Sequence, residues 1–552
     1  MNTTKPGTNR SGAPLTGNQY FLYITAFFSG MSVMAVELAA SRLLAPYFSS
    51  SQIVWTVIIG TIMIALALGN IAGGRLADKD PDPARLYRRL LAAALWTAAI
   101  PFAGKYIITG VSLALAMFVK TNFLIWASLL SCFLVFVFPL ILLGTVSPSL
   151  IKLCVLNLEE NGKVVGELSA INTVGSIIGT FLPTFVTIPA VGTAATFLIF
   201  AGILTAICLA YFLSVKKNVL RSLLLLALIL GSLLFPASKS FAFWESNLLY
   251  EGESVYNYLQ VKDTPNSVIF STNVLEGIQS IMMKNDEFTG MYFEYALAGP
   301  LIAGVPLRGE AGAGGGHRLL MLGLGTGTYA TQCMKHFPGA VFEGVEIDEK
   351  IVWLAEEFFR LPPEVEVSVA DGRAYLQNSG LYDVILVDAY QDITIPFQLS
   401  SQEFFGMVRD HLKENGVMAV NLNMRSDKEG SLNHYLCDTI ASQFPYVYTM
   451  PLYTSTNTIL FASLYPGMPD LLEARVSAMG AGDPLQPLMR SLLAGLREYE
   501  AGALILTDDK APVELLGMKV IDELIAGSLR YYQDILTEEG LGGLLKSMGI
   551  TG

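Results

Sequence analysis

The stretch RLLMLGLGTGTYATQCMKHF (318–337) decides the fold of the second half of this chain. Its apolar start predicts a buried strand, and a helical pattern follows the glycines. Gly323, Gly325 and Gly327 permit a tight turn and let a ligand come close to the main chain. A strand, a glycine turn and a helix in this order are typical of nucleotide-binding α/β domains.

Two further apolar strands end in acidic residues. VFEGVEI (341–347) follows the first helix, and YDVILVDAY (382–390) comes later. Alternating strands and helices predict a parallel sheet with helices on both faces, whose ligands lie beyond the carboxyl ends of the strands. We therefore expect a doubly wound, Rossmann-like α/β domain of the methyltransferase kind.

The acidic residues that follow these strands have the chemistry of a nucleoside site. Glu346 stands about twenty residues after the glycine turn, where a carboxylate accepts both hydroxyls of a ribose. Asp371, in ADGRAYL, is placed to accept from an adenine amino group. Helix capping or turn formation explains each residue singly. The ordered set, with the glycines, favours a nucleoside site.

The first half of the chain is apolar and basic. Up to Lys239 it holds 16 Lys and Arg against 7 Asp and Glu, while the remainder holds 19 and 40. A bilayer crossing needs about 20 residues, and seven stretches are long enough. A shorter piece, 106–119, is either an interfacial helix or part of an eighth crossing. The expected spans are 20–46, 53–74, 88–109, 123–151, 166–191, 192–214 and 219–236.

Composition divides the chain into four parts. They are a disordered tail (1–19), a helical membrane domain (20–239), a small β-hairpin domain (240–306) and the nucleotide-binding domain (307–552). The acidic second half fits neither nucleic acid nor a lipid surface, since both are polyanions. Scattered cysteines and histidines indicate neither a disulfide framework nor a metal site.

A multi-pass protein of a bacterial-type inner membrane is the expectation, but its orientation is ambiguous. The basic loop 75–89 predicts a cytoplasmic N-terminus. Seven spans then put the nucleotide domain outside, whereas supply of a cytosolic cofactor favours the cytoplasm. Cofactor supply is given the greater weight, so a cytoplasmic nucleotide domain is the expectation. Glu37 and Arg42 lie within the first span, where charge is costly. A structural role, with Asn70 or Asn172 as partners, and a transport path are both open.

With these strands, glycines and acids, the sequence resembles the spermidine synthase family of aminopropyltransferases, in its membrane-fused form. The likeness covers roughly 240–465, and LTDDKAPVE (506–514) resembles the closing segment of the fused proteins. The matching pieces are ESVYNYLQV, GIQSI, MYFEYALAGPL, LGLGTGT, VEIDEKIV, ADGRAYL and YDVILVDAYQDITIPFQLSSQEFF.

The resemblance implies a reaction and residues for it. In this family a neutral amine such as putrescine attacks the carbon beside the sulfonium of decarboxylated S-adenosylmethionine, releasing methylthioadenosine without a metal. Asp388 matches the catalytic carboxylate that accepts the amine proton. Tyr292 and Tyr453 match tyrosines of the polyamine channel, and Asn257 stands where the family has a nucleotide-contacting Gln. The resemblance also implies a homo-oligomer.

Two departures from the family pattern leave the substrate open. Thr326 replaces an Asp that holds the aminopropyl ammonium, and Gln391 replaces a second substrate Asp, with Asp392 one step later. Thr326 would accommodate the carboxylate of intact S-adenosylmethionine, which an Asp repels. The alternatives are therefore methyl transfer, or cleavage of S-adenosylmethionine by a lyase, and a transporter or receptor with a nucleotide-sensing domain.

Overall fold

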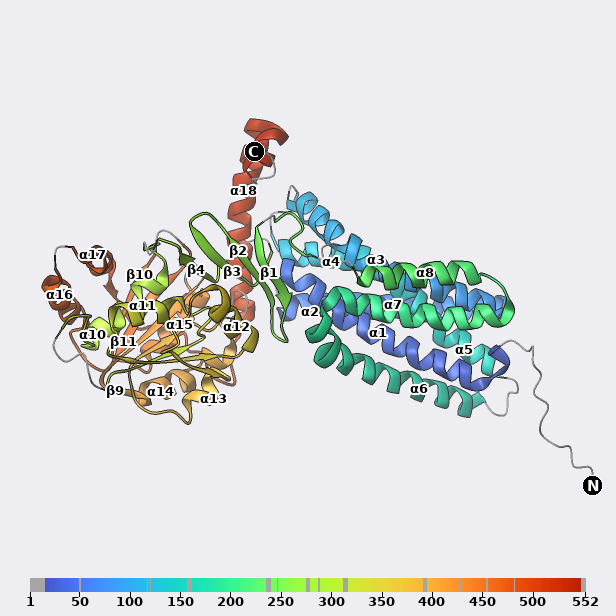
Figure 1. The fold of residues 1–552 in the computed structure, drawn as a ribbon, viewed down its shortest axis with the longest axis horizontal. Coiled ribbons are helices and arrows are strands. Elements are labelled where there is room, and N and C mark those ends of the chain that lie inside the picture. Colours follow the sequence, from blue (N-terminus) through green and yellow to red (C-terminus); the bar gives the residue numbers. More distant parts are fainter. Residues whose placement is uncertain are drawn as a thin grey trace, which may run out of the picture. The chain divides into compact units, whose positions relative to one another are not determined.

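The computed structural model of this protein describes most of the chain, and every structural statement below refers to this part. The described residues are 15–48, 51–116, 118–119, 121–155, 161–234, 240–245, 247–274, 278–285, 288–310, 316–390, 395–423, 425–426, 428–452, 455–480 and 482–547. They form two compact units (Figure 1). The first comprises Met1–Glu245 and Gly252–Tyr258, and the second Ser246–Glu251 and Leu259–Gly552.

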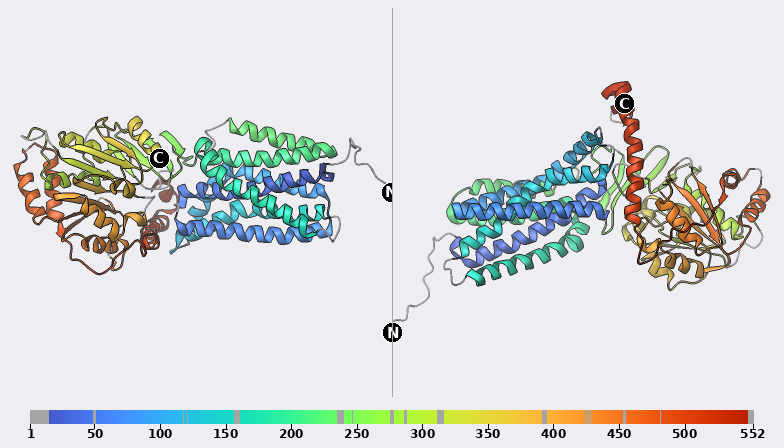
Figure 2. Two further views of the ribbon diagram at one scale, coloured as in Figure 1. Left: turned by 90° about the horizontal axis from the view of Figure 1, so that it is seen from below. Right: turned by 180° about the vertical axis from the view of Figure 1, so that it is seen from behind.

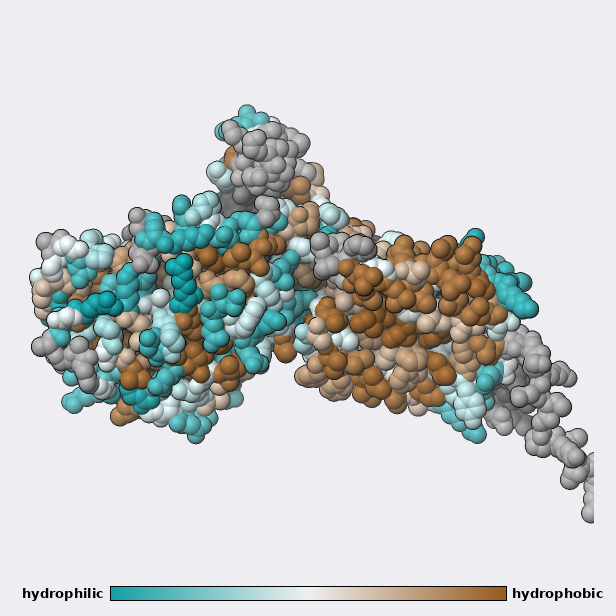
Figure 3. Space-filling view, in the orientation of Figure 1, coloured by the Kyte–Doolittle hydropathy of each residue, from teal (hydrophilic) through white to brown (hydrophobic). Residues whose placement is uncertain are grey.

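The first unit is a bundle of apolar helices. By length and composition, five helical stretches in the described residues are apolar enough to cross a membrane, and Val219–Leu233 is a shorter apolar helix. Figure 3 shows apolar side chains over the visible face of this bundle. Its helices are α1 (Gln19–Phe48), α2 (Gln52–Lys79), α3 (Pro83–Ala116), α4 (Phe123–Gly144), α5 (Val146–Cys154), α6 (Asn161–Leu182), α7 (Ile188–Val215) and α8 (Val219–Leu233).

The chain runs along the bundle seven times within the described residues, because α5 continues α4 and the stretch from α6 to α7 reverses direction (Figures 1 and 2). A π-helical turn, Pro183–Thr187, and Gly192 with a φ of 81° make that reversal. The carboxylate of Glu253 accepts from the backbone N–H of Thr193, at 2.7 Å, and so caps the helix after Gly192.

Glycines let the helices of this unit touch main chain to main chain. A Cβ on Gly175 or Gly179 of α6 would lie 2.0 or 2.1 Å from the carbonyl oxygen of Phe27 or Met31 of α1. Gly69 of α2 meets the backbone of α4 in the same way. Close approach at small residues is the usual packing of apolar helices in a bilayer, where no hydrophobic force drives helices together.

A four-stranded antiparallel sheet follows, in the order β1-β2-β3-β4. Leu259 and Val261 alternate with residues that face away, and with Phe270 they pack on Ile351 and Leu354 of α12 (Glu349–Phe358). The strands are β1 (Leu248–Glu253), β2 (Tyr258–Asp263), β3 (Ser267–Ser271) and β4 (Ser280–Met283). The short helices α9 (Tyr292–Tyr295) and α10 (Ala298–Ile302) lead into the next sheet.

The second sheet has the order β12-β10-β11-β9-β8-β5-β6-β7. Strands β9 to β7 in that order are parallel, whereas β11, β10 and β12 extend the edge in antiparallel fashion. The strands are β5 (Arg318–Leu322), β6 (Val341–Glu346), β7 (Glu366–Val369), β8 (Tyr382–Val387), β9 (Leu412–Leu422), β10 (Tyr446–Pro451), β11 (Thr458–Ser463) and β12 (Arg497–Glu498).

Helices cover both faces of this sheet, and one apolar core lies on each face (Figure 2). They are α11 (Thr328–His336), α12, α13 (Gly372–Leu376), α14 (Gln402–Asp410), α15 (Leu432–Ala441), α16 (Met468–Ala478), α17 (Leu485–Gly495) and α18 (Val513–Ser547). Apolar helices followed by a doubly wound α/β sheet confirm the predicted fold class.

Some expected elements differ from the observed ones. Residues Leu15–Gly17 form a 3-10 turn and α1 starts at Gln19, so the expectation of a disordered segment up to residue 19 is wrong for its last residues. The piece 106–119 is no separate crossing, since its residues up to Ala116 belong to α3. Within α1, Arg42 donates to the carbonyl oxygen of Val255. Asn172, one of the two partners expected for these charges, donates from Nδ2 to the hydroxyl of Ser147.

Candidate functional site

The glycine turn lies where the connections of the large sheet diverge. From β5 the chain passes to β6 on one side, while β8 adjoins β5 on the other, and ligands of open α/β sheets bind at such a switch point. Gly323, with a φ of 88°, approaches the end of β8 so closely that a Cβ would lie 2.4 Å from the carbonyl oxygen of Asp388. Only glycine combines this φ with this approach without strain.

Glu346 ends β6 beside the glycine turn. It is 8% exposed, and its carboxylate accepts from the backbone N–H groups of Gly325, at 2.9 Å, and Asp348, at 3.1 Å. Burial raises the pKa of Glu346, and these two bonds oppose the rise. The carboxylate, predicted from the sequence to bind a ribose, thus lies beside the glycine turn and fixes its main chain.

Asp371 follows β7 and is the N-cap of α13. Its carboxylate accepts from the backbone N–H of Ala374 at 2.8 Å. Capping therefore accounts for the orientation of this side chain, as weighed from the sequence. Its main-chain neighbour Ala370 donates to the carbonyl oxygen of Glu346 at 3.0 Å, so both acidic residues stand at one edge of the sheet.

Asp388 follows β8 and is the most strongly perturbed acid of this edge. Tyr292 donates to its Oδ2 and Asn421 to its Oδ1, each at 2.8 Å. Burial, with the charge of Glu346 as a lesser contribution, raises the pKa of Asp388 to about 7, and the two hydrogen bonds oppose that rise. An acid with a pKa near neutrality between two fixed donors suits proton transfer.

A second amide stands behind the first. Asn457 donates from Nδ2 to Oδ1 of Asn421 at 2.8 Å, and Asn421 is 3% exposed. Sequence reasoning missed both residues. An Asn inside the otherwise apolar strand VMAVNL (417–422) is the signal that pointed to Asn421, since a buried amide needs partners.

Thr326 is fully buried in the glycine turn, and its hydroxyl has no hydrogen-bond partner among the described residues. An unpaired buried hydroxyl is costly unless a ligand or water satisfies it. Together with the glycine turn and Glu346, it fits a nucleoside co-substrate at this edge of the sheet.

The other predicted site residues are placed as follows. Asn257 lies in the first compact unit, half-buried, and its backbone N–H donates to the hydroxyl of Ser254 at 2.9 Å. Tyr292, predicted for the polyamine channel, contacts Asp388 directly. Gln391, Asp392 and Tyr453 lie outside the described residues.

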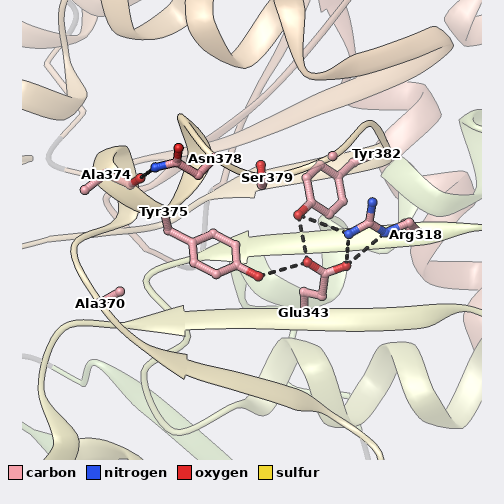
Figure 4. A pocket seen from close by; sticks show the side chains of 9 residues that line it. Arg318, Glu343, Ala370, Ala374, Tyr375, Asn378, Ser379 and Tyr382 are labelled. Carbon is pink, nitrogen blue, oxygen red and sulfur yellow. Dashed lines mark hydrogen bonds and ion pairs between the residues drawn. The ribbon is translucent and has the colours of Figure 1, made fainter.

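A pocket of about 490 Å³ lies next to Asp371, because Ala370 and Ala374 are among its lining residues (Figure 4). At its centre the carboxylate of Glu343 accepts from Arg318 and from the hydroxyls of Tyr375 and Tyr382, at 3.0 and 2.7 Å. The dashed lines that meet at the carboxylate of Glu343 in Figure 4 mark these bonds, which join β5, β6, α13 and β8.

A doubly wound sheet with a glycine turn at its switch point and acids at the strand ends defines a class, the Rossmann-like transferases that use S-adenosylmethionine or its relatives. Residues 300–465 match the model of the spermine/spermidine synthase domain. The chain is 45% identical over 359 residues to a probable polyamine aminopropyl transferase of Bifidobacterium longum, covering 62% of this chain and 78% of that one. It therefore belongs to the polyamine aminopropyltransferase family.

The chain is also similar, at lower identity, to a second relative and to a solved structure. A polyamine aminopropyltransferase of Vibrio vulnificus is 26% identical over 314 residues, covering 54% of this chain and 99% of that one. The crystal structure of a probable spermidine synthase from Corynebacterium glutamicum superimposes with a TM-score of 0.35 at 21% identity, over 47% of this chain and 97% of that one. The family model and the two relatives named as aminopropyltransferases confirm the predicted enzyme class, a transferase.

Proposed function

We propose that this protein is a membrane-bound aminopropyltransferase that uses decarboxylated S-adenosylmethionine and a putrescine-like amine. The observation that carries the proposal is the placement of Asp388, whose carboxylate accepts from Tyr292 and Asn421 at the switch point of the sheet and whose burial raises its pKa. Residues Gly323–Gly327 and Glu346 support a nucleoside beside it, and Asp371 is retained as the adenine acceptor.

The chemistry needs a neutral amine next to an electrophilic carbon. The amine nitrogen attacks the aminopropyl carbon bonded to the sulfonium, the carbon–sulfur bond breaks, and its electron pair stays on sulfur as methylthioadenosine. The nitrogen loses one proton, which Asp388 accepts. Because the pKa of Asp388 is raised, this carboxylate is a stronger base than an ordinary one. Holding the two reactants in line is worth roughly 7–11 kcal/mol in the best cases.

Intact S-adenosylmethionine is the second candidate substrate, and Thr326 favours it. A buried hydroxyl stands where the family has an Asp that attracts the aminopropyl ammonium. The hydroxyl donates to a carboxylate, which that Asp would repel. Without an amine, the carboxylate of S-adenosylmethionine would attack its own carbon beside the sulfonium. The carbon–sulfur bond would break, its electron pair would stay on the sulfur of methylthioadenosine, and the remainder would leave as a lactone, with the charge of Asp388 near the sulfonium.

A product assay distinguishes these reactions. Full-length protein in detergent is incubated with labelled putrescine and decarboxylated S-adenosylmethionine, and a labelled triamine formed with equimolar methylthioadenosine supports the proposal. Methylthioadenosine from intact S-adenosylmethionine without any amine supports cleavage instead. Absence of binding of either nucleotide by calorimetry would remove both.

We further propose that the bundle crosses a bacterial-type inner membrane with its basic end in the cytoplasm. The chain runs along the bundle an odd number of times, so the start of α1 and the end of α8 would lie on opposite sides of the membrane. At the other end the described cations are Arg42 and Lys105, and the Lys/Arg bias of short loops sets orientation. The cations at the basic end are Arg75, Lys79, Arg85, Arg88, Arg89, Lys152, Lys163, Lys216, Lys217 and Arg221.

This orientation puts the residues after α8 on the outer side, which differs from the cytoplasmic position that cofactor supply favours. The sulfonium nucleoside must then be available there. Alkaline phosphatase fused to the C-terminus is expected to be active and a C-terminal green fluorescent protein dark, with N-terminal fusions as the reverse control. A bright C-terminal fluorescent fusion would instead support a cytoplasmic catalytic unit.

A further inference from the structure

The carboxylate of Asp388 is the end of a directional chain of amides. Nδ2 of Asn457 donates to Oδ1 of Asn421, and Nδ2 of Asn421 donates to Oδ1 of Asp388, both at 2.8 Å. An ionised carboxylate only accepts, so the amide group of Asn421 must face it, and the oxygen of Asn421 must then face a donor. The Nδ2 of Asn457 is that donor.

The reverse orientation of Asn421 would lose both bonds. Its oxygen would face the carboxylate of Asp388, and its amide group would face that of Asn457. Asn421 itself is fixed in β9, where it pairs with Ile459 of β11, and Tyr390 donates to its carbonyl oxygen. The side-chain amide of Asn421 is therefore held in one orientation from two sides, by the carboxylate of Asp388 and by Nδ2 of Asn457.

Asn457 belongs to a different part of the chain from the acid it affects. It immediately precedes β11, and its carbonyl oxygen accepts from the backbone N–H of Leu452 at 2.9 Å. The segment closed in this way contains Tyr453, a predicted substrate residue that lies outside the described residues. A change in the position of Asn457 therefore reaches the base through one intervening side chain.

We propose that Asn421 and Asn457 are positioning residues for the aminopropyl transfer, with Asn457 orienting the amide of Asn421 and Asn421 orienting the carboxylate of Asp388. This rests on the proposed function. The titratable groups that face Asp388 are Tyr292 of α9, Tyr390 on its own loop and Glu346 at the end of β6. The two amides carry no charge and do not titrate. They fix the orientation of the carboxylate of Asp388 and lower its proton affinity through hydrogen bonding.

The test is a double-mutant cycle in the full-length protein, read by kcat/KM against pH. Asn421→Ala removes one bond to the carboxylate, and we expect the acid limb to move up by about one pH unit, with roughly a tenfold loss at pH 6.5. Asn457→Ala is expected to move the limb in the same direction by a smaller amount. The double variant should equal Asn421→Ala alone, because Asn457 acts only through Asn421.

Thr456→Ala is the matched control, since its hydroxyl bonds Asn423 at 3.4 Å rather than Asn421. Its pH profile should be that of the parent protein. Additive losses in the double variant, or an acid limb that stays in place in Asn421→Ala, would overturn the proposal and leave the two amides a purely structural part.

An infrared titration separates failure of this inference from failure of the proposed function, because it needs no substrate. The carboxyl band that disappears in Asp388→Asn reports the protonation of Asp388 directly. Its midpoint is expected to rise in Asn421→Ala whatever the reaction is. An unchanged midpoint overturns the positioning role, whereas absence of triamine product from the parent protein counts only against aminopropyl transfer.

Discussion

The two units of this protein use glycine for different purposes. In the helical unit, Gly179 has a helical main chain and supplies space alone, so that α6 meets α1 backbone to backbone. In the second unit, Gly323 supplies the same closeness together with a positive φ, and the backbone it approaches belongs to Asp388, the acid that we propose as the base. In the first unit the close contact serves helix packing alone. In the second unit it also positions the carboxylate of Asp388. Substitutions in the first unit should therefore lower stability, and substitutions at Asp388 should lower turnover.

The largest effect expected from this separation is the loss of turnover in Asp388→Asn. The substitution keeps the shape of the side chain and removes the proton acceptor, and general-base catalysis is worth about 10²–10⁴-fold. Affinity for methylthioadenosine, measured by calorimetry, should change little. In the parent protein, turnover should fall as the pH drops through about 7, because the acid is then protonated. Near-normal turnover by the variant would exclude Asp388 as the base.

A substitution at Gly179 is expected to have the opposite signature. Gly179→Leu puts a side chain where a single Cβ already lies 2.1 Å from the carbonyl oxygen of Met31, and overpacking costs about 1–3 kcal/mol or more. The thermal midpoint of the detergent-solubilised protein should fall, while turnover per folded molecule is retained. Gly166→Leu on the same helix is the control, because nothing lies within 4 Å of its Cβ position.

Much of this arrangement is predictable from sequence, since it depends on local pattern. Hydropathy finds the helical stretches, and the apolar strands with their glycine turn and terminal acids predict the doubly wound sheet. Asp388 is predictable because it follows a strand in a recognisable segment. The antiparallel strands β10–β12 were not predicted, since their pairing depends on the strand each one adjoins in the sheet rather than on their own periodicity.

The partners of the acid were harder to foresee. Tyr292 was expected in a substrate channel, yet it donates to Asp388 from a segment far away in sequence. Asn421 and Asn457 lie on neighbouring strands and belong to no motif, so only the fold brings them together. Asp371 shows the reverse case, because its capping bond to Ala374 was foreseeable from sequence and describes its observed contact.

An intermediate effect is expected for Glu346, which serves both shape and charge. Glu346→Ala removes the acceptor for Gly325 and Asp348 and the predicted ribose ligand together. Each lost charge-assisted bond is worth about 1.5–3 kcal/mol, so the Kd for methylthioadenosine should rise by roughly tenfold to a hundredfold. Glu346→Gln keeps an acceptor oxygen and should lose less. Equal affinities of the parent and Ala proteins in calorimetry would remove Glu346 from the nucleotide site.

The smallest effect is expected for an ion pair at the surface, between Arg373 and Asp508. Arg373 of α13 donates to both oxygens of Asp508, at 2.8 and 2.7 Å, and Ser401 also donates to that carboxylate. This joins the closing segment of the chain to α13 and α14. Asp508 is 40% exposed, so solvent screening limits its contribution to about 1 kcal/mol or less.

The pH dependence of this contact has a definite sign. The guanidinium of Arg373 lowers the pKa of Asp508 below its usual value, so the stabilisation is complete above the ordinary Asp pKa and is lost as the pH falls through the lowered one. Asp508→Asn should therefore lower the thermal midpoint at pH 7 by about 1–2 °C, and this difference should shrink as the pH falls below the ordinary Asp pKa. Asp509→Asn, an exposed neighbour, is the matched control. A loss of thermal stability in Asp508→Asn that is as large at low pH as at pH 7 would show that the contact of Asp508 with Arg373 stabilises through packing rather than charge.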